Sequence, residues 1–204
     1  MDESFFKWLK LLLHIPSAND GNYQQYISHM IWYGDNASYT VASVTAFLTT
    51  FTLNTYLPTA VLFAVISFTG IWALFRTFAH LYPNHLRSIA IAVLFIPSMA
   101  VWGSGVFKDT ICIFALGWLT YSSFRILVQK DFSLKNIFYT ILSFSLIVTV
   151  KIYIIMAFAP ALMMWILFNY SQRIKNSTTK FLIKLIFIGG IFGASLFFMQ
   201  VYSK

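Results

Sequence analysis

Charged residues are scarce in this sequence. Only 10% of its 204 residues are Asp, Glu, Lys or Arg, whereas 59% are hydrophobic and 19% are aromatic. A soluble globular domain carries about 25% charged residues, so this chain has too little polar material to cover a water-exposed surface. The scarcity excludes a soluble enzyme, a disordered chain and a collagen-like chain. It indicates a polytopic membrane protein.

Several sequence signals are also absent. Cys112 is the only cysteine, which excludes an intrachain disulfide and a cysteine-based zinc site. The first four residues lack the basic segment and cleavage site of a signal peptide. No Walker, G-x-S-x-G or G-x-G-x-x-G motif occurs, and the histidines do not have metal-binding spacing. The sequence therefore specifies no metal and no nucleotide cofactor, and it leaves a divalent cation open.

Long uncharged runs fill most of residues 39–204. A bilayer core of about 30 Å needs roughly 20 apolar helical residues to cross it. We therefore predict an all-α, polytopic helical membrane domain with about six transmembrane helices. The predicted spans cover residues 57–79, 88–107, 110–128, 135–150, 152–170 and 181–202.

The first 54 residues differ from the rest. Residues 5–15 are apolar but too short for a span, and Lys7 and Lys10 interrupt them, which favours an interfacial helix. Turn residues at 16–22 and several tyrosines follow, as is typical of a membrane–water boundary. We predict an external or interfacial region over residues 1–38. Apolar residues then recur at steps of three and four, which predicts an amphipathic surface helix over 39–54.

The basic residues orient the chain. They are scattered singly between apolar runs, which argues against nucleic-acid binding. If the predicted spans alternate sides, one face receives nine basic residues and the other receives three beyond the N-terminal region, so the first face is cytoplasmic. The nine are Arg76, Arg87, Arg125, Lys130, Lys135, Arg173, Lys175, Lys180 and Lys184, and the three are Lys108, Lys151 and Lys204.

Residues 97–109 form the most unusual stretch of the sequence. It opens with a proline that breaks or kinks the incoming helix. Trp102 then leads into Gly-Ser-Gly at 103–105, whose small residues let the backbone approach a neighbour or a ligand closely. Lys108 and Asp109 begin the next predicted helix, where a lysine beside free N–H groups can hold phosphate. The alternatives are a Lys108 that reaches lipid headgroups and an Asp109 that caps the helix.

Three further residues are candidates for a site on the external face. Lys151 stands alone between two apolar runs, on the same predicted side as Lys108, and Tyr153 is close by in sequence. Two lone external lysines favour an anionic ligand, although both residues also suit the headgroup and aromatic zone. Asp35 is the candidate general base or metal ligand of the external loop, or else a helix N-cap. Asp20 is the other acid of that region.

These motifs resemble a known class of enzyme. The loop at 32–39, the run at 97–109 and the element at 151–153 resemble bacterial polytopic proteins that are similar to the GT-C class of glycosyltransferases. The resemblance spans most of residues 16–170. It implies a multi-helix enzyme of the bacterial inner (cytoplasmic) membrane that uses a polyprenyl-phosphate-linked sugar, with a catalytic acid and surface-lying helices in its first external loop.

The chain departs from the GT-C pattern in one respect. It has no transmembrane helix before the external loop and no paired acidic motif there, so we expect a truncated chain or a shortened relative. Asp35 is then the candidate catalytic acid. The candidate substrate-binding residues are Trp102, Lys108, Asp109, Lys151 and Tyr153.

Three functions are compatible with these residues. The first is transfer of a sugar from a polyprenyl phosphate during cell-envelope glycan assembly. The second is non-enzymatic handling of a lipid-linked glycan, as in a flippase or a polymerase-associated subunit, with the same lysines binding phosphate only. A transporter ranks third, because every ionisable residue from Arg76 onward can be placed near a membrane face. The expected partners are the lipid bilayer and the lipid-linked phosphate sugar.

Overall fold

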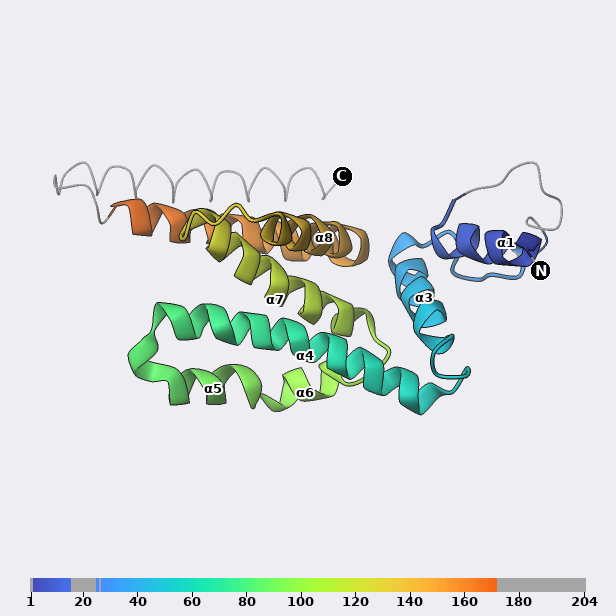
Figure 1. Ribbon diagram of the computed structural model, residues 1–204, viewed down its shortest axis with the longest axis horizontal. Helices are drawn as coiled ribbons and strands as arrows, with labels where there is room; N and C mark the ends of the chain where they lie inside the picture. Colours follow the sequence, from blue (N-terminus) through green and yellow to red (C-terminus); the bar gives the residue numbers. More distant parts are fainter. Residues whose placement is uncertain (1, 16–24, 26, 172–204) are drawn as a thin grey trace, which may run out of the picture. The chain divides into compact units, whose positions relative to one another are not determined.

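The computed structural model describes residues 2–15, 25 and 27–171, and every regular element in this part of the chain is a helix. The all-α prediction is confirmed for these residues. The chain divides into two compact units, Met1–Ile152 and Tyr153–Lys204. The helices, labelled in Figure 1, are α1 (Asp2–Leu12), α3 (Asn36–Thr49), α4 (Tyr56–Leu81), the 3-10 helix η1 (Pro83–His85), α5 (Leu86–Leu94), α6 (Pro97–Gly103), α7 (Lys108–Leu127) and α8 (Leu134–Ser171).

Three helical segments among the described residues are long and apolar enough to cross a membrane. They are Tyr56–Leu81, Lys108–Leu127 and Leu134–Ile166. Large apolar side chains remain exposed along one face of α4, which suits contact with lipid rather than with water. These exposed side chains are Leu57, Val61, Val65, Phe68 and Trp72.

The bent pair Pro83–Leu94 and Pro97–Gly103 is a fourth candidate span. Its two parts are inclined by 49°, in line with the break or kink that Pro97 predicts within the segment 88–107. The break lies at Ile96, whose backbone is extended (φ −74°, ψ 118°). A residue that precedes proline disfavours the helical conformation, so Pro97 ends one helix and begins the next.

The tightest helix packing is between α4 and α7, which lie side by side (Figure 1). Gly70 and Gly117 meet at this crossing. A Cβ atom on Gly117 would lie 2.0 Å from the carbonyl oxygen of Gly70, so neither position has room for a side chain. Small polar residues also line the buried faces, among them Ser67 and Ser122. Such close backbone contact is the usual way in which membrane helices pack without large side chains between them.

The helix α8 covers two of the predicted spans. The sequence predicted separate helices over 135–150 and 152–170, and the structure has one element with a non-helical residue inside it. That residue is Lys151, with φ −150° and ψ 81°. The helix is therefore interrupted at the lysine that divides the two apolar runs. The predicted span over residues 181–202 lies outside the described residues.

The helix α3 differs in its bounds from the predicted surface helix over 39–54. It begins three residues earlier because Asp35 caps it, and it ends at Thr49. Leu53 and Asn54 then adopt left-handed backbone angles (φ 51° and 56°), which turn the chain toward α4. Its 14 residues correspond to about 21 Å at 1.5 Å per residue. That length is short of a bilayer core of about 30 Å.

Aromatic contacts join α1 to α3. The Tyr39 hydroxyl on α3 donates a hydrogen bond to the carbonyl oxygen of Leu11 on α1. The His14 ring stacks on Tyr39 with 4.1 Å between centroids, and Tyr33 packs edge-on against both rings. The N-terminal helix α1 is therefore anchored to α3, the helix that Asp35 caps.

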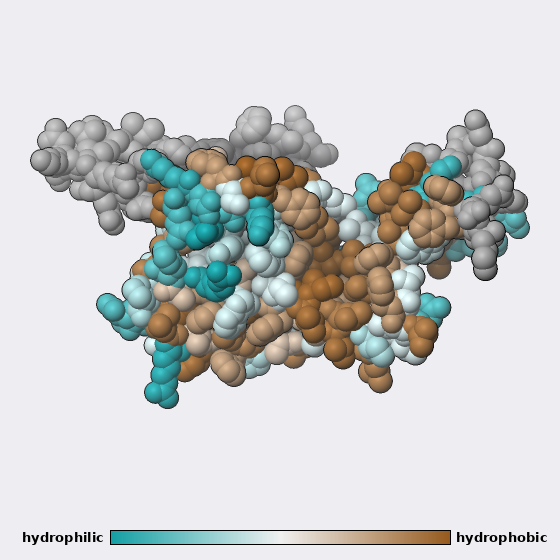
Figure 2. All heavy atoms as spheres, in the orientation of Figure 1, coloured by the Kyte–Doolittle hydropathy of each residue, from teal (hydrophilic) through white to brown (hydrophobic). Residues whose placement is uncertain are grey.

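A polar cluster lies where α7 ends. The Arg125 guanidinium donates to Gln129 and to Asp131, each at 2.6 Å. Gln129 also contacts His80 of α4 at 2.9 Å, and the backbone of Asp131 accepts from Asn136 of α8. Hydrophilic residues gather at this end of α4 and α7 in the space-filling view (Figure 2, teal).

Candidate functional site

The beginning of α7 is fixed by the loop that precedes it. The buried Thr110 hydroxyl lies 2.9 Å from the carbonyl oxygen of Trp102 and 2.6 Å from that of Gly105. A Cβ atom on Gly105 would lie 2.3 Å from a ring carbon of Phe107, so a larger residue there would displace the Phe107 ring. The tight loop determines where the first side chains of α7 project, and Lys108 is the first of them.

Asp35 is the N-cap of α3. Its carboxylate accepts hydrogen bonds from the Ala37 N–H at 3.1 Å, from the Ser38 N–H at 3.3 Å and from the Ser38 hydroxyl. The hydroxyl of Ser38 is the largest cause of a lowered pKa, and Lys108 and the Ala37 N–H add to it. The pKa of Asp35 is lowered from 3.8 to about 2. Asp35 is therefore a carboxylate at neutral pH.

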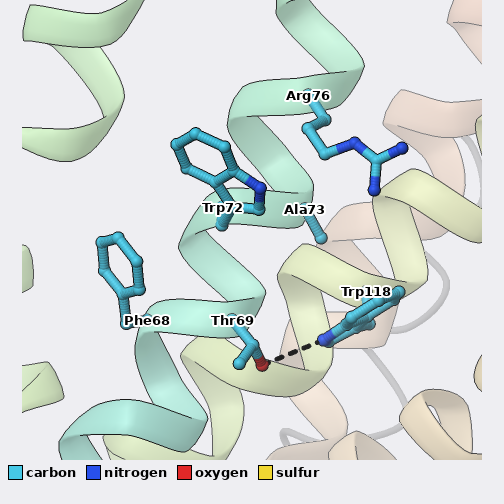
Figure 3. A pocket seen from close by; sticks show the side chains of 6 residues that line it. All are labelled: Phe68, Thr69, Trp72, Ala73, Arg76 and Trp118. Atoms are coloured by element: carbon cyan, nitrogen blue, oxygen red, sulfur yellow. Dashed lines mark hydrogen bonds between the residues drawn. The ribbon is translucent and has the colours of Figure 1, made fainter.

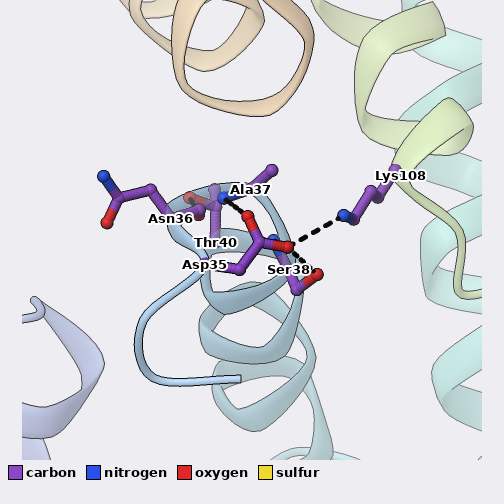
Figure 4. Close-up of polar contacts among 6 residues, drawn as sticks. All are labelled: Asp35, Asn36, Ala37, Ser38, Thr40 and Lys108. Carbon is purple, nitrogen blue, oxygen red and sulfur yellow. Dashed lines mark hydrogen bonds and ion pairs between the residues drawn. The ribbon is translucent and has the colours of Figure 1, made fainter. Parts of the chain in front are cut away.

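Lys108 connects α7 to this cap. Its Nζ lies 3.3 Å from Oδ2 of Asp35, and Figure 4 shows the lysine reaching from α7 toward the first turn of α3. The two side chains are 39% and 47% exposed. An ion pair this exposed adds little to stability, so Lys108 can exchange Asp35 for another anion at low cost.

A second ion pair begins at the next residue. Asp109 lies in the first turn of α7, and its Oδ1 accepts from Nζ of Lys151 at 2.5 Å. The Lys151 side chain is only 21% exposed, and its backbone forms the interruption in α8. Because Lys108 and Asp109 are adjacent, the two ion pairs connect α3, α7 and α8 at the N-terminus of α7.

The structure thus pairs four of the residues singled out from the sequence, Lys108 with Asp35 and Lys151 with Asp109, and the two pairs begin at adjacent residues of α7. Trp102 lies near this loop, half exposed, with its ring edge-on to Phe107 at 6.0 Å. Tyr153 is 61% exposed and belongs to the second unit.

The sequence also left open whether Asp35 binds a metal ion. Among the described residues, no group of three or more His, Cys, Asp or Glu side chains gathers to hold a metal ion. Asp20 lies outside the described residues. The polar chemistry that the structure does assemble consists of paired carboxylates and amines.

Sequence reasoning did not assign a role to Ser38. The residue lies three positions after the N-cap, where a polar side chain bonds back to the cap in capping-box motifs. In this chain the hydroxyl donates to the carboxylate itself, which is why it dominates the lowered pKa of Asp35. The Asp-x-x-Ser spacing in the sequence indicates this contact.

We expect the pKa of Asp35 to depend on Ser38 more than on Lys108. The pKa of the folded state lies below the ordinary value of 3.8, so these contacts stabilise the cap fully above that value and are lost as the pH falls through about 2. Ser38→Ala should raise the pKa of Asp35 further than Lys108→Met does. A pH titration of the carboxyl carbon by NMR measures both shifts, and an unmutated protein that titrates near 3.8 would contradict the assignment.

In the part of the chain that the structure describes, the fold is all-helical with three helices long and apolar enough to cross a membrane, and two ion pairs lie at the beginning of one of them. Comparisons with protein-family models, with curated proteins and with solved structures found no match for this chain.

Proposed function

We propose that this chain is an integral protein of the bacterial inner membrane that transfers a sugar from a polyprenyl-phosphate donor at the external face. The observation that carries the proposal is the double ion pair at the N-terminus of α7. It holds the amines of Lys108 and Lys151 close to adjacent residues of one helix end. Two amines and the free N–H groups of a helix N-terminus are groups that bind phosphate.

Helix lengths support five of the six predicted spans. The 38 residues of α8 would extend about 57 Å as one straight helix, far beyond a bilayer core of about 30 Å. The interruption at Lys151 divides it near the middle, so we assign two spans to α8 that turn at a membrane face. α4, α7 and the bent pair of α5 and α6 supply three more, and the sixth predicted span, residues 181–202, lies outside the described residues. The surface helix corresponds to α3.

The orientation of the site follows from charge. Lys108 begins α7, and the cluster around Arg125 lies at the other end of the same helix. The 20 residues of α7 span about 30 Å, which matches a bilayer core. The end near Arg125 belongs to the face that is rich in basic residues, which is the cytoplasmic face by the positive-inside rule. The ion pairs are then external.

The ion pairs suit a phosphate for a physical reason. In the structure a carboxylate already holds each lysine near the N-terminus of α7. Each lysine side chain has therefore lost much of its rotational freedom before a phosphate binds. A phosphate group offers more negative charge and more acceptor oxygens than a carboxylate. It can therefore take over Lys108 from Asp35 and Lys151 from Asp109 without leaving either amine unpaired.

The proposed reaction moves one glycosyl group. The bond between the anomeric carbon and the phosphate oxygen breaks, and a bond forms between that carbon and the acceptor hydroxyl oxygen. The proton of the hydroxyl passes to the carboxylate of Asp35, and the leaving polyprenyl phosphate is stabilised by the lysines. Transfer of Lys108 to the phosphate removes one cause of the low pKa of Asp35 and so makes it a better base.

One observation favours the non-enzymatic alternative. The Asp35 carboxylate already accepts hydrogen bonds from Ala37 and Ser38 and is paired with Lys108, contacts that a purely structural N-cap would also make. A protein that only binds or moves a lipid-linked glycan needs the lysines and not a base. The two functions differ in what substitution of Asp35 does.

Donor binding tests the phosphate site directly. We expect Lys108→Met and Lys151→Met each to weaken binding of a labelled polyprenyl-phosphate sugar in nanodiscs. Loss of a hydrogen bond to a charged group corresponds to a roughly ten- to hundredfold weaker affinity. Lys135→Met is the matched control, because Lys135 is exposed near the beginning of α8, away from both ion pairs. Unchanged affinity in both site variants would eliminate the phosphate site.

A further inference from the structure

A groove lies between α4 and α7, where Trp118 in the middle of α7 faces the second half of α4. Its volume is 380 Å³, and Figure 3 shows the side chains that line it. They are Phe68, Thr69, Trp72, Ala73, Arg76 and Trp118. Phe68, Trp72 and Arg76 follow one another at steps of four residues along α4, so they form a stripe about 12 Å long.

Apart from Arg76, the polar side-chain groups of the groove are the Trp118 indole and the Thr69 hydroxyl, which are bonded to each other, and the indole N–H of Trp72. The indole N–H of Trp118 donates to the Thr69 hydroxyl at 3.2 Å, and that hydroxyl donates to the Ile66 carbonyl oxygen at 2.7 Å. The Trp118 ring is stacked on Tyr139 with 4.2 Å between centroids. Trp118 and Thr69 are therefore held in place by contacts with each other and with neighbouring residues, and the rest of the lining away from Arg76 is mostly apolar, which suits an apolar occupant.

Arg76 closes one end of this apolar stripe. The side chain is exposed, and its guanidinium carbon lies 4.9 Å from the centroid of the Tyr121 ring. Among the described residues no carboxylate pairs with it, because Asp131, the acid near this end of the helices, is bonded to Arg125. The guanidinium is thus oriented by an aromatic ring and has donors left for an anion.

We infer that this groove binds one anionic glycerophospholipid, with an acyl chain along Phe68 and Trp72 and the phosphate on Arg76. α4 and α7 are candidate spans, so the groove opens toward lipid. A phospholipid combines an apolar chain with an anionic group at one end, as the groove combines an aromatic stripe with a cation. Basic pockets between membrane helices recognise anionic headgroups in this way. The inference does not depend on the proposed transferase reaction.

Native mass spectrometry tests the assignment. The purified protein is released from micelles that contain equal amounts of phosphatidylglycerol and phosphatidylcholine. We expect one retained phosphatidylglycerol, preferred about fivefold over phosphatidylcholine. Arg76→Gln should abolish this preference, whereas Arg87→Gln, a matched change on α5 outside the groove, should preserve it.

Brominated lipids give a second measurement that needs no variant. Phosphatidylglycerol with brominated acyl chains should quench more of the protein's total tryptophan fluorescence than the matching phosphatidylcholine does, because Trp72 and Trp118 line the groove and contribute to that signal. Equal retention of both lipids together with equal quenching would overturn the inference. The inference would also be overturned if Arg76→Gln and Arg87→Gln retained phosphatidylglycerol to the same extent. If added polyprenyl phosphate, and not phosphatidylglycerol, were the lipid lost in Arg76→Gln, the assigned occupant would be wrong.

Discussion

Gly117→Leu is expected to separate α4 from α7 and to unfold the protein at much lower denaturant. A Cβ atom alone would lie 2.0 Å from the carbonyl oxygen of Gly70, and a backbone atom cannot move aside as a flexible side chain can. Overpacking of this kind costs about 1–3 kcal/mol when the added group is small. Gly117→Ala should fall in that range and Gly117→Leu beyond it. Unfolding in mixed micelles, followed by tryptophan fluorescence, measures the loss.

Gly34 provides the matched control for this prediction. A Cβ atom on Gly34 meets nothing within 4 Å, so Gly34→Ala should change the unfolding midpoint little. Surface substitutions away from special features usually stay within about 0.5 kcal/mol. If Gly117→Ala proved as mild as Gly34→Ala, the close crossing of α4 and α7 would be incorrect.

Asp35→Asn is expected to abolish sugar transfer and leave donor binding within a few-fold of the unmutated protein. A positioned general base contributes roughly 10²- to 10⁴-fold to rate, and an amide cannot accept the proton of the acceptor hydroxyl. The assay measures transfer from a polyprenyl-phosphate donor to an acceptor extract in proteoliposomes, with donor binding measured in parallel in nanodiscs.

The cap and the base must be separated in this experiment, because Asp35 begins α3. Asparagine and serine are both good N-caps, so Asp35→Asn and Asp35→Ser keep the helix and remove the carboxylate. Both should lose transfer. Transfer that survives in both variants would remove Asp35 as the base. Donor binding without transfer in the unmutated protein would favour the non-enzymatic function.

The helical class and most of the apolar segments could be predicted from the sequence. Charge scarcity and run length are local properties, and so is the interruption by a lone lysine at 151 or by Pro97. The cap at Asp35 is also local, because it involves only the next three residues. Features of this kind are determined within one or two helical turns.

The remaining features depend on contacts between distant residues. Lys108 and Asp35 are 73 positions apart and Lys151 and Asp109 are 42 apart, so the sequence placed these residues on one side but did not pair them. The contact of Gly70 with Gly117 could not be predicted from the sequence, because these residues are also far apart along the chain. The break at Pro97 within the predicted segment 88–107 was expected from the sequence, whereas the angle of 49° between its two parts could not be read from local residues.

The central claim is that one lipid phosphate lies between Lys108 and Lys151. Solid-state NMR of the protein labelled with ¹⁵N at lysine Nζ, in nanodiscs with polyprenyl phosphate, measures the ³¹P–¹⁵N dipolar coupling directly. A hydrogen bond of about 2.7–2.9 Å from ammonium to phosphate oxygen brings the two nuclei close enough for a strong coupling. We predict two coupled lysine signals, one lost in Lys108→Met and the other in Lys151→Met. Couplings that persist unchanged in both variants, or no coupling in the unmutated protein, would contradict the claim.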